Sequence, residues 1–195
     1  PRSIPPSPDS RALEDLDRAQ VWHPFTQMKE YETSEPVIVD RAEGSYFTDT
    51  QGRRWLDGVS SLWVALHGHR HPALDEAVRS QLEKVAHTTL LGLANAPSVE
   101  LAGELIRRAP RGLNRVFYSD SGSEAMEIAI KMAFQYWKNK GEERPLFIAP
   151  SQAYHGDTVG AVSVGGIERF HEIFRPLLFK VLGIRRISSI SRSDG

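Results

Sequence analysis

A turn rich in serine and glycine, Ser121-Gly122-Ser123, lies between a short apolar run and a long amphipathic segment. The segment after the turn predicts a helix, so the backbone N–H groups of the turn would lie free at the positive end of that helix. Together with the serine hydroxyls, these groups suit a phosphate. The alternative is an ordinary helix cap in a flexible turn. The chain contains no P-loop motif and no G-x-G-x-x-G dinucleotide fingerprint.

A second polar segment covers Tyr154 to Thr158. Because Tyr154 lies in a polar loop, we interpret it as an aromatic platform for a ligand in preference to a core tyrosine. Asp157 and His155 could form an acid–base pair, but residues two apart more often form a turn in which the aspartate binds its own backbone.

Three alternating histidines, His67, His69 and His71, would share one face of a strand and could bind a metal there. Gly68 and Pro72 favour a loop instead, and no carboxylate partner is evident. We therefore predict no metal site.

The elements that position these residues begin with a small N-terminal part. The sequence predicts a short helix capped by Asp9, then three short strands in an antiparallel meander, then a loop that joins two domains. These elements cover residues 9–19, 37–39, 46–48, 53–56 and 57–71. Trp63, in the loop, is either a plug at a domain interface or the wall of a substrate pocket.

The second part alternates helices with short apolar strands. Pro72 and Pro97 each open a predicted helix, and the long helix after the turn ends near Gly141. Strands are predicted at residues 115–119 and 146–149. This order predicts an α/β domain with a mainly parallel sheet, in which ligands lie beyond the carboxyl ends of the strands. Both the turn and Tyr154 fall at that edge.

The composition excludes several classes of protein. The 195 residues include 24 basic and 25 acidic ones, so nucleic acid is not an expected partner. No cysteine is present, which removes disulfides and thiolate sites and fits a reducing compartment. No apolar run reaches the length of a membrane span, and the proline-rich first ten residues do not form a signal peptide. We expect a cytoplasmic protein that does not contact membranes.

Six segments of the chain resemble the class III pyridoxal-phosphate-dependent aminotransferases. They are WHPFTQM (22–28), DGVSSLW (57–63), HGH (67–69), YSDSGSEA (118–125), KMAFQYW (131–137) and YHGDT (154–158). The resemblance implies the α/β fold of the type I pyridoxal-phosphate transferases in truncated form. We expect residues 1–57 to hold a disordered N-terminus and part of a small α+β domain. Residues 58–179 would begin the large, mainly parallel-sheet domain, and 180–195 form an atypical Ser/Arg-rich tail.

The resemblance also implies the cofactor and the residues that bind it. Pyridoxal 5'-phosphate is the expected cofactor, with its phosphate held at Ser121, Gly122 and Ser123. Tyr154 would stack against the pyridine ring or line the substrate pocket.

Phe25, Leu62 and Trp63 lie where the family forms its substrate wall. The implied reaction transfers an amino group to 8-amino-7-oxononanoate in biotin biosynthesis, with S-adenosylmethionine or lysine as donor. Much of the S-adenosylmethionine branch has Tyr in place of Phe25 and Trp in place of Leu62, whereas a lysine-using branch has an aliphatic residue at the second position. The alternatives are another class III ω-amino-acid aminotransferase and a non-catalytic fragment that binds an anion or a metal. The family implies a homodimer.

The catalytic residues of the family are not found in this sequence. Its Schiff-base lysine and the aspartate that pairs with the pyridine nitrogen lie downstream of residue 195, and no lysine here lies in a matching motif. We therefore expect a fragment that is inactive as given. A shortened parallel sheet is also expected to leave an unpaired edge.

Overall fold

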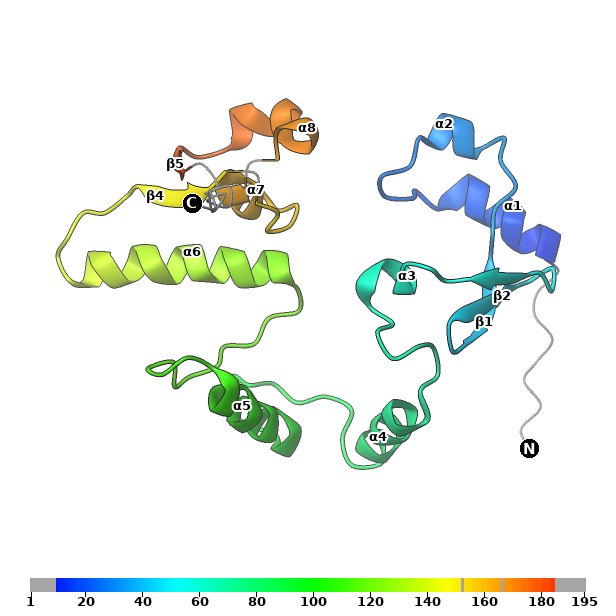
Figure 1. Ribbon diagram of the computed structural model, residues 1–195, viewed down its shortest axis with the longest axis horizontal. Coiled ribbons are helices and arrows are strands. Elements are labelled where there is room, and N and C mark those ends of the chain that lie inside the picture. Colours follow the sequence, from blue (N-terminus) through cyan, green and yellow to red (C-terminus); the bar gives the residue numbers. More distant parts are fainter. Residues whose placement is uncertain (1–9, 152, 166, 185–195) are drawn as a thin grey trace, which may run out of the picture. The chain divides into compact units, whose positions relative to one another are not determined.

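The computed structural model describes residues 10–151, 153–165 and 167–184. Contacts divide the chain into two compact units, Pro1–Asn95 and Ala96–Gly195 (Figure 1). The division between residues 95 and 96 does not test the domain limits predicted at residues 57 and 179, so those limits stay predictions. No helix in the described ranges is both long enough and apolar enough to span a membrane.

The first unit contains a small antiparallel sheet of order β1-β2-β3. Its elements are α1 (Ser10–Gln20), α2 (Met28–Tyr31), β1 (Val39–Glu43), β2 (Tyr46–Asp49), β3 (Arg54–Leu56), α3 (Ser60–Trp63) and α4 (Pro72–Leu82). The predicted meander is confirmed, although its first strand covers residues 39–43 instead of 37–39. The hairpin turn causes this shift: Gly44 has a φ of 56°, and the pairing of Glu43 with Tyr46 around the turn sets the register.

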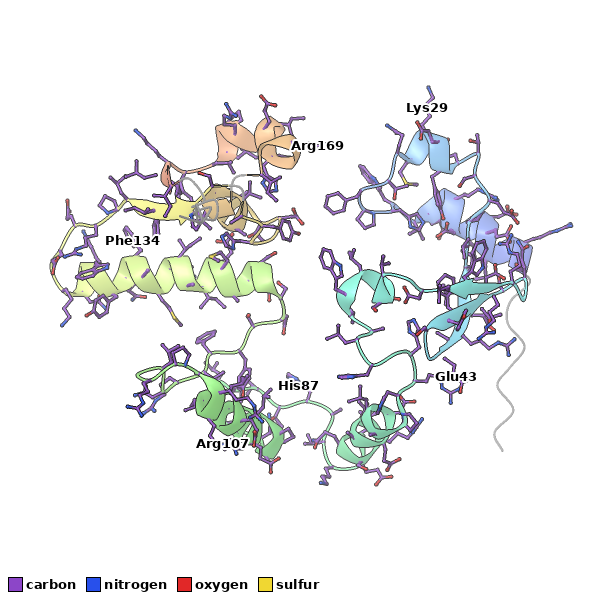
Figure 2. All side chains as sticks on the ribbon, viewed as in Figure 1. Lys29, Glu43, His87, Arg107, Phe134 and Arg169 are labelled. Atoms are coloured by element: carbon purple, nitrogen blue, oxygen red, sulfur yellow. The ribbon has the colours of Figure 1, made fainter. Side chains whose placement is uncertain are left out.

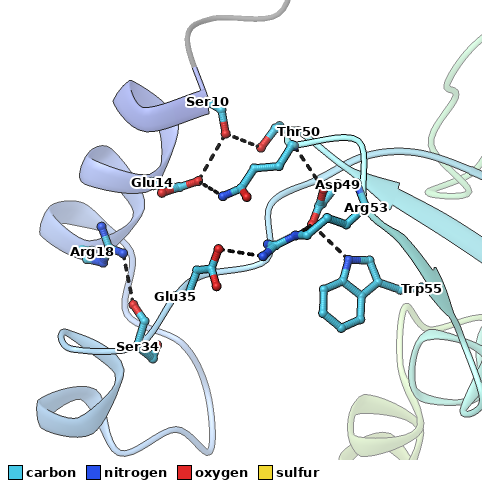
Figure 3. A network of polar contacts seen from close by, with 10 residues as sticks. Ser10, Glu14, Arg18, Ser34, Glu35, Asp49, Thr50, Arg53 and Trp55 are labelled. Atoms are coloured by element: carbon cyan, nitrogen blue, oxygen red, sulfur yellow. Dashed lines mark hydrogen bonds and ion pairs between the residues drawn. The ribbon is translucent and has the colours of Figure 1, made fainter.

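A buried carboxylate organises the turn between β2 and β3 (Figure 3). Asp49, only 2% exposed, accepts hydrogen bonds from the backbone N–H groups of Gln51 (3.0 Å) and Arg53 (2.8 Å). The Arg53 Nε and the Trp55 indole N–H also donate to it, at 2.6 Å and 3.0 Å. Burial by itself raises the pKa of Asp49, but the hydrogen bonds from Trp55 and Arg53 outweigh it and lower this pKa to about 2.

The same turn anchors the first helix to the sheet. The hydroxyl of Ser10, the first residue of α1, lies 2.9 Å from that of Thr50. One turn further along α1, Glu14 accepts a hydrogen bond of 2.7 Å from the side-chain amide of Gln51. The helix is therefore held by polar contacts, and none of its residues is buried.

The second unit is an α/β arrangement. Its elements are α5 (Ala96–Arg108), α6 (Gly122–Asn139), β4 (Phe147–Pro150), α7 (Val159–Gly165), α8 (Glu168–His171), the 3-10 helix η1 (Glu172–Leu177) and β5 (Val181–Ile184). Strands β4 and β5 pair in parallel, with three helices in the connection between them. Their parallel direction agrees with the mainly parallel sheet that the sequence predicts.

Two features of this unit differ from the sequence analysis. Residues 115–119 form no strand, and the described residues offer no neighbouring strand to pair with them. Val181–Ile184, assigned to the atypical tail, instead forms β5 beside β4. A strand exists only where a partner supplies hydrogen bonds, and local sequence does not show that partner. The rest of the tail, residues 185–195, lies outside the described residues.

Helix α7 is the core of the second unit. Five of its seven residues are buried, including Ala161, Val162 and Val164. Gly160 donates its backbone N–H to Glu127 Oε1 on α6 at 2.8 Å, and a Cβ at Gly160 would lie 2.6 Å from the Glu127 carboxyl carbon. The glycine therefore leaves room for the Glu127 carboxylate to bind the start of α7.

Large apolar side chains of the second unit remain open to solvent. Phe134 on α6, labelled in Figure 2, is 49% exposed and lines an open apolar pocket with Phe147 and Phe179. On its other side, β4 has no partner strand among the described residues. The unpaired sheet edge expected from the sequence is thus present in this part of the chain.

Candidate cofactor site

The predicted phosphate turn is built as a helix cap. Ser121 is the N-cap of α6, and its hydroxyl accepts a hydrogen bond from the Glu124 backbone N–H at 3.2 Å. The Glu124 carboxylate in turn accepts the Asp120 N–H at 2.9 Å. This arrangement is close to a capping box, in which a serine and a glutamate three residues later satisfy the helix start reciprocally. Ser121 therefore caps the helix, and its predicted contact with a phosphate stays a prediction.

The cap leaves two donors for a ligand. Gly122 and Ser123 are the first two residues of α6, so their N–H groups have no acceptor within the helix. Throughout the described ranges, neither amide donates a hydrogen bond. Both groups stand at the positive end of an 18-residue helix, where an anion is stabilised. Capping and anion binding are compatible at this turn. Capping uses the N–H groups of Asp120 and Glu124, whereas an anion would use those of Gly122 and Ser123.

The loop after β4 meets this helix end. An open pocket of about 440 Å³ is lined by Gly122, Ser123, Met126, Tyr154, His155 and Gly156. The pocket contains residues of both segments that the sequence analysis placed at the carboxyl edge of the sheet. The structure therefore brings Gly122, Ser123 and Tyr154 together, although 31 positions separate Ser123 from Tyr154 (154 minus 123).

Gly156 makes the close approach possible. Its φ is 114°, a value that side chains rarely permit. A Cβ at this position would collide with Ser123 Oγ and lie 2.7 Å from Ser123 Cβ. The pocket combines the closely packed Gly156, two free backbone amides and a tyrosine ring. This combination fits a phosphate ester of an aromatic ring, and pyridoxal phosphate is such a compound.

Tyr154 and Asp157 form a short hydrogen bond beside the pocket. The Tyr154 hydroxyl donates to Asp157 Oδ2 at 2.6 Å. This bond is the main reason that the pKa of Tyr154 is raised, with smaller contributions from burial and from the negative charge of Asp157. In the described residues Asp157 pairs with Tyr154 and with His171, and not with His155, so an acid–base pair of Asp157 and His155 does not form.

The predicted wall residues share an unusual backbone conformation. Phe25, Leu62 and Trp63 have φ values of 52°, 60° and 71°, in the left-handed region that favours glycine. Their side chains are 92%, 65% and 71% exposed. A residue with a side chain costs about 1–2 kcal/mol in this conformation, and such strain clusters at functional sites. This conformation supports a functional role for the three residues without identifying their ligand.

Helix α3 is a left-handed turn. All four of its residues have positive φ, between 48° at Ser61 and 71° at Trp63. The Asp57 carboxylate accepts the Ser61 backbone N–H at 2.9 Å and the Ser61 hydroxyl at 2.8 Å. His69 Nε2 lies 2.8 Å from the same carboxylate. Asp57 therefore joins the strained turn to a second segment of the chain.

The hydrogen bonds also control the charge of Asp57. The two from Ser61 are the largest cause that lowers its pKa to about 2, with smaller contributions from His69 and the Val59 N–H, and burial opposes them. Asp57 is a structural residue that was not predicted from the sequence. Asp57 directly follows a strand and lies four residues before Ser61, and from this position its hydrogen bonds to the local backbone could have been predicted.

The histidine segment forms a loop with a structural role. His69 exchanges backbone hydrogen bonds of 2.7 Å and 3.0 Å with Gly44, beside its contact with Asp57. The rings of His67 and His71 meet edge to face at 5.9 Å. Within the described ranges, no group of three or more histidine, aspartate or glutamate side chains could hold a metal ion.

Comparison with known proteins adds a family match. Residues 27–191 match the family model described as aminotransferase class-III. A curated relative from Nitratidesulfovibrio vulgaris, named adenosylmethionine-8-amino-7-oxononanoate aminotransferase, is 58% identical over 180 residues, which cover 90% of this chain and 33% of the relative. A relative of the same name from Aquifex aeolicus is 57% identical over 175 residues, covering 89% of this chain and 39% of the relative. The chain thus spans a third to two fifths of the length of these relatives.

Solved structures agree with this match. The crystal structure of adenosylmethionine-8-amino-7-oxononanoate aminotransferase from Methanocaldococcus jannaschii superposes with a TM-score of 0.86 at 49% identity, covering 91% of this chain and 41% of that one. An (S)-enantioselective omega-transaminase from Thermomicrobium roseum superposes with a TM-score of 0.81 at 34% identity, covering 91% and 40%. The fold expected from the sequence is confirmed for the part that this chain spans.

Proposed function

Because the chain belongs to the class-III aminotransferases, which depend on pyridoxal phosphate, we propose that it contributes the phosphate grip and the substrate wall of such an enzyme. The reaction that we propose transfers an amino group to 8-amino-7-oxononanoate in biotin biosynthesis. The observation that carries the proposal is the pocket at which the free amides of Gly122 and Ser123 meet Tyr154 and Gly156. The names of relatives that are 57% and 58% identical support the substrate.

Each residue of the site has a proposed task. The amides of Gly122 and Ser123, with the serine hydroxyls, bind the phosphate, and Tyr154 orients the ring beside it. In the first unit, Phe25, Leu62 and Trp63 are proposed to serve as a substrate wall. The cofactor, when bound, supplies an electron sink for amino transfer. We also propose a homodimer, as the family resemblance implies, and a cytoplasmic location, in line with the composition.

The amino donor has two candidates. The names of the relatives favour S-adenosylmethionine. Lysine is the second candidate, since Phe25 and Leu62 replace the Tyr and Trp that much of the S-adenosylmethionine branch carries. A smaller side chain at residue 62 changes the width and polarity of the wall that the donor meets.

A chimera tests both the reaction and the donor. The segment of the Aquifex aeolicus relative that matches this chain over 175 residues is replaced by the corresponding residues of this chain. The remainder of the relative supplies what this chain does not contain. We expect the chimera to aminate 8-amino-7-oxononanoate with at least one of the two donors, measured by product formation with each donor separately.

The unaltered relative and a chimera with Leu62→Trp serve as controls. A shift of donor preference in the Leu62→Trp chimera would support the role of residue 62 in the wall. A folded chimera that accepts only ω-amino acids would support the alternative class III activity, which the similarity to an omega-transaminase at 34% identity also allows. A folded chimera without any amino transfer would contradict the proposal.

A further inference from the structure

Three side chains lead from the interior of the second unit to the pocket. Tyr154 borders the pocket, its hydroxyl donates to Asp157 Oδ2 at 2.6 Å, and Asp157 Oδ1 lies 3.7 Å from His171 Nε2. The two carboxylate oxygens therefore face different partners. The loop after β4 supplies Tyr154 and Asp157, and α8 supplies His171.

His171 is the buried end of this series. The residue is 6% exposed, and among the described residues neither ring nitrogen has a hydrogen-bond partner. Buried polar atoms in proteins almost always have a partner. Asp157 Oδ1 stands just beyond hydrogen-bond distance, and a shift of less than about 1 Å would make a normal hydrogen bond.

Tyr154, at the exposed end of this series, needs a partner that restricts its side chain. The Tyr154 residue is 55% exposed, and the side chain of Asp157 is 48% exposed. A tyrosine on an open loop can rotate, and a single hydrogen bond to an equally exposed carboxylate restricts it only while that carboxylate is itself held. A buried imidazole behind the second oxygen would hold it.

We propose that Asp157 and His171 are positioning residues that fix the ring of Tyr154 over the pocket and thereby increase the affinity of the site for an aromatic phosphate ester. The inference rests on the proposed function, because that function supplies the aromatic ring. It predicts that the two residues affect recognition of the ring and not of the phosphate, which Gly122 and Ser123 bind.

The test compares two ligands, pyridoxal phosphate and inorganic phosphate, by calorimetric titration of the 195-residue chain. His171→Phe keeps a ring without nitrogens, and Asp157→Ala removes the carboxylate at an exposed position. Each is expected to weaken pyridoxal phosphate binding about three- to tenfold, the range of an aromatic contact, and to leave inorganic phosphate unchanged. Asp157→Asn retains an acceptor for the tyrosine and should restore most of the affinity. His87→Phe, an exposed histidine in the first unit, should change neither.

A second readout does not need a ligand. The ionisation of Tyr154 is followed by ultraviolet absorbance, and Tyr154→Phe identifies its contribution. Asp157→Ala and His171→Phe should each lower the pKa of Tyr154 toward its ordinary value of about 10. If neither variant moves this ionisation or the affinity for pyridoxal phosphate, or if both ligands weaken equally, the positioning role is wrong. If the unaltered chain binds neither ligand, the phosphate grip of the proposed function is wrong, and the tyrosine ionisation still decides this inference.

Discussion

Gly156 has no side chain, and this allows two segments that are distant in the chain to form one pocket. The loop after β4 reaches the start of α6 only because no Cβ stands between Gly156 and the Ser123 hydroxyl. At the same scale, Asp49 and Asp57 each collect several donors, and each ends with a pKa of about 2. Single residues therefore determine where backbone segments can meet and which turns persist.

Gly156→Ala tests the close approach. The new Cβ adds strain at a φ of 114° and collides with Ser123, so we expect a loss of about 1–3 kcal/mol of unfolding free energy and weaker binding of inorganic phosphate. The measurement is urea unfolding together with phosphate titration. Gly112→Ala is the matched control, since Gly112 has a φ of 98° but, in the described ranges, no atom within 4 Å of where its Cβ would stand. Equal effects of the two variants would show that the contact with Ser123 is unimportant.

Asp49 makes the stability of the first unit depend on pH. Its pKa is about 2 in the folded chain and about 3.9 in an unfolded one, so the folded state favours the charged form. This contribution is present above about pH 4 and is lost as the pH falls toward 2. The pKa of Asp57 is lowered to the same value, so its contribution to stability is lost over the same pH range. Asp49→Asn should lower the urea midpoint at pH 7, and the gap to the unaltered chain should narrow as the pH falls through this range. A gap that stays constant from about pH 7 to pH 2 would rule out this role.

Among the elements, the left-handed turn α3 has the most unusual backbone. Four consecutive residues with side chains hold positive φ, from Ser60 to Trp63. The turn persists because Asp57 binds the Ser61 amide and hydroxyl, and because His69 and its bridge to Gly44 hold the following segment. The strain orients Leu62 and Trp63, which a right-handed turn would point elsewhere.

A pair of substitutions at Leu62 measures this strain. Leu62→Gly should be about 1 kcal/mol more stable than Leu62→Ala, because glycine adopts positive φ without steric cost. Leu74 in α4 gives the matched comparison, in which Leu74→Gly should be about 1 kcal/mol less stable than Leu74→Ala. Thermal unfolding of the four variants provides the measurement. The same sign at both positions would mean that residue 62 is not left-handed in solution.

For the whole molecule, the main feature is the division into two units between Asn95 and Ala96. The segment between α4 and α5, residues 83–95, forms no helix or strand. Leu91 and Leu93 within it are 90% and 64% exposed. Each unit has its own hydrogen-bond network, centred on Asp49 in the first and on the α6–α7 contact in the second.

Limited proteolysis examines this division. Thermolysin cleaves before exposed leucines in unstructured segments, so the first cuts should fall at Leu90 to Leu93 and leave two fragments near the limits of the units. Mass spectrometry of the early products identifies the sites. Leu91→Asp combined with Leu93→Asp should slow these cuts. Initial cleavage within α6 or β2 would contradict the division.

The sequence by itself determined the features that depend on neighbouring residues. The helix start at Ser121, the helix end near Gly141 and the meander were predicted because caps, turns and apolar periodicity are local, and the family was predicted from the resemblance of six segments. Only the tertiary structure decided which apolar runs became strands, so that β5 formed and residues 115–119 did not. It also decided the left-handed turn and the burial of His171 behind Asp157. A strand forms only where a partner distant in the chain supplies hydrogen bonds, and neither a left-handed backbone nor the burial of one histidine follows from local sequence patterns.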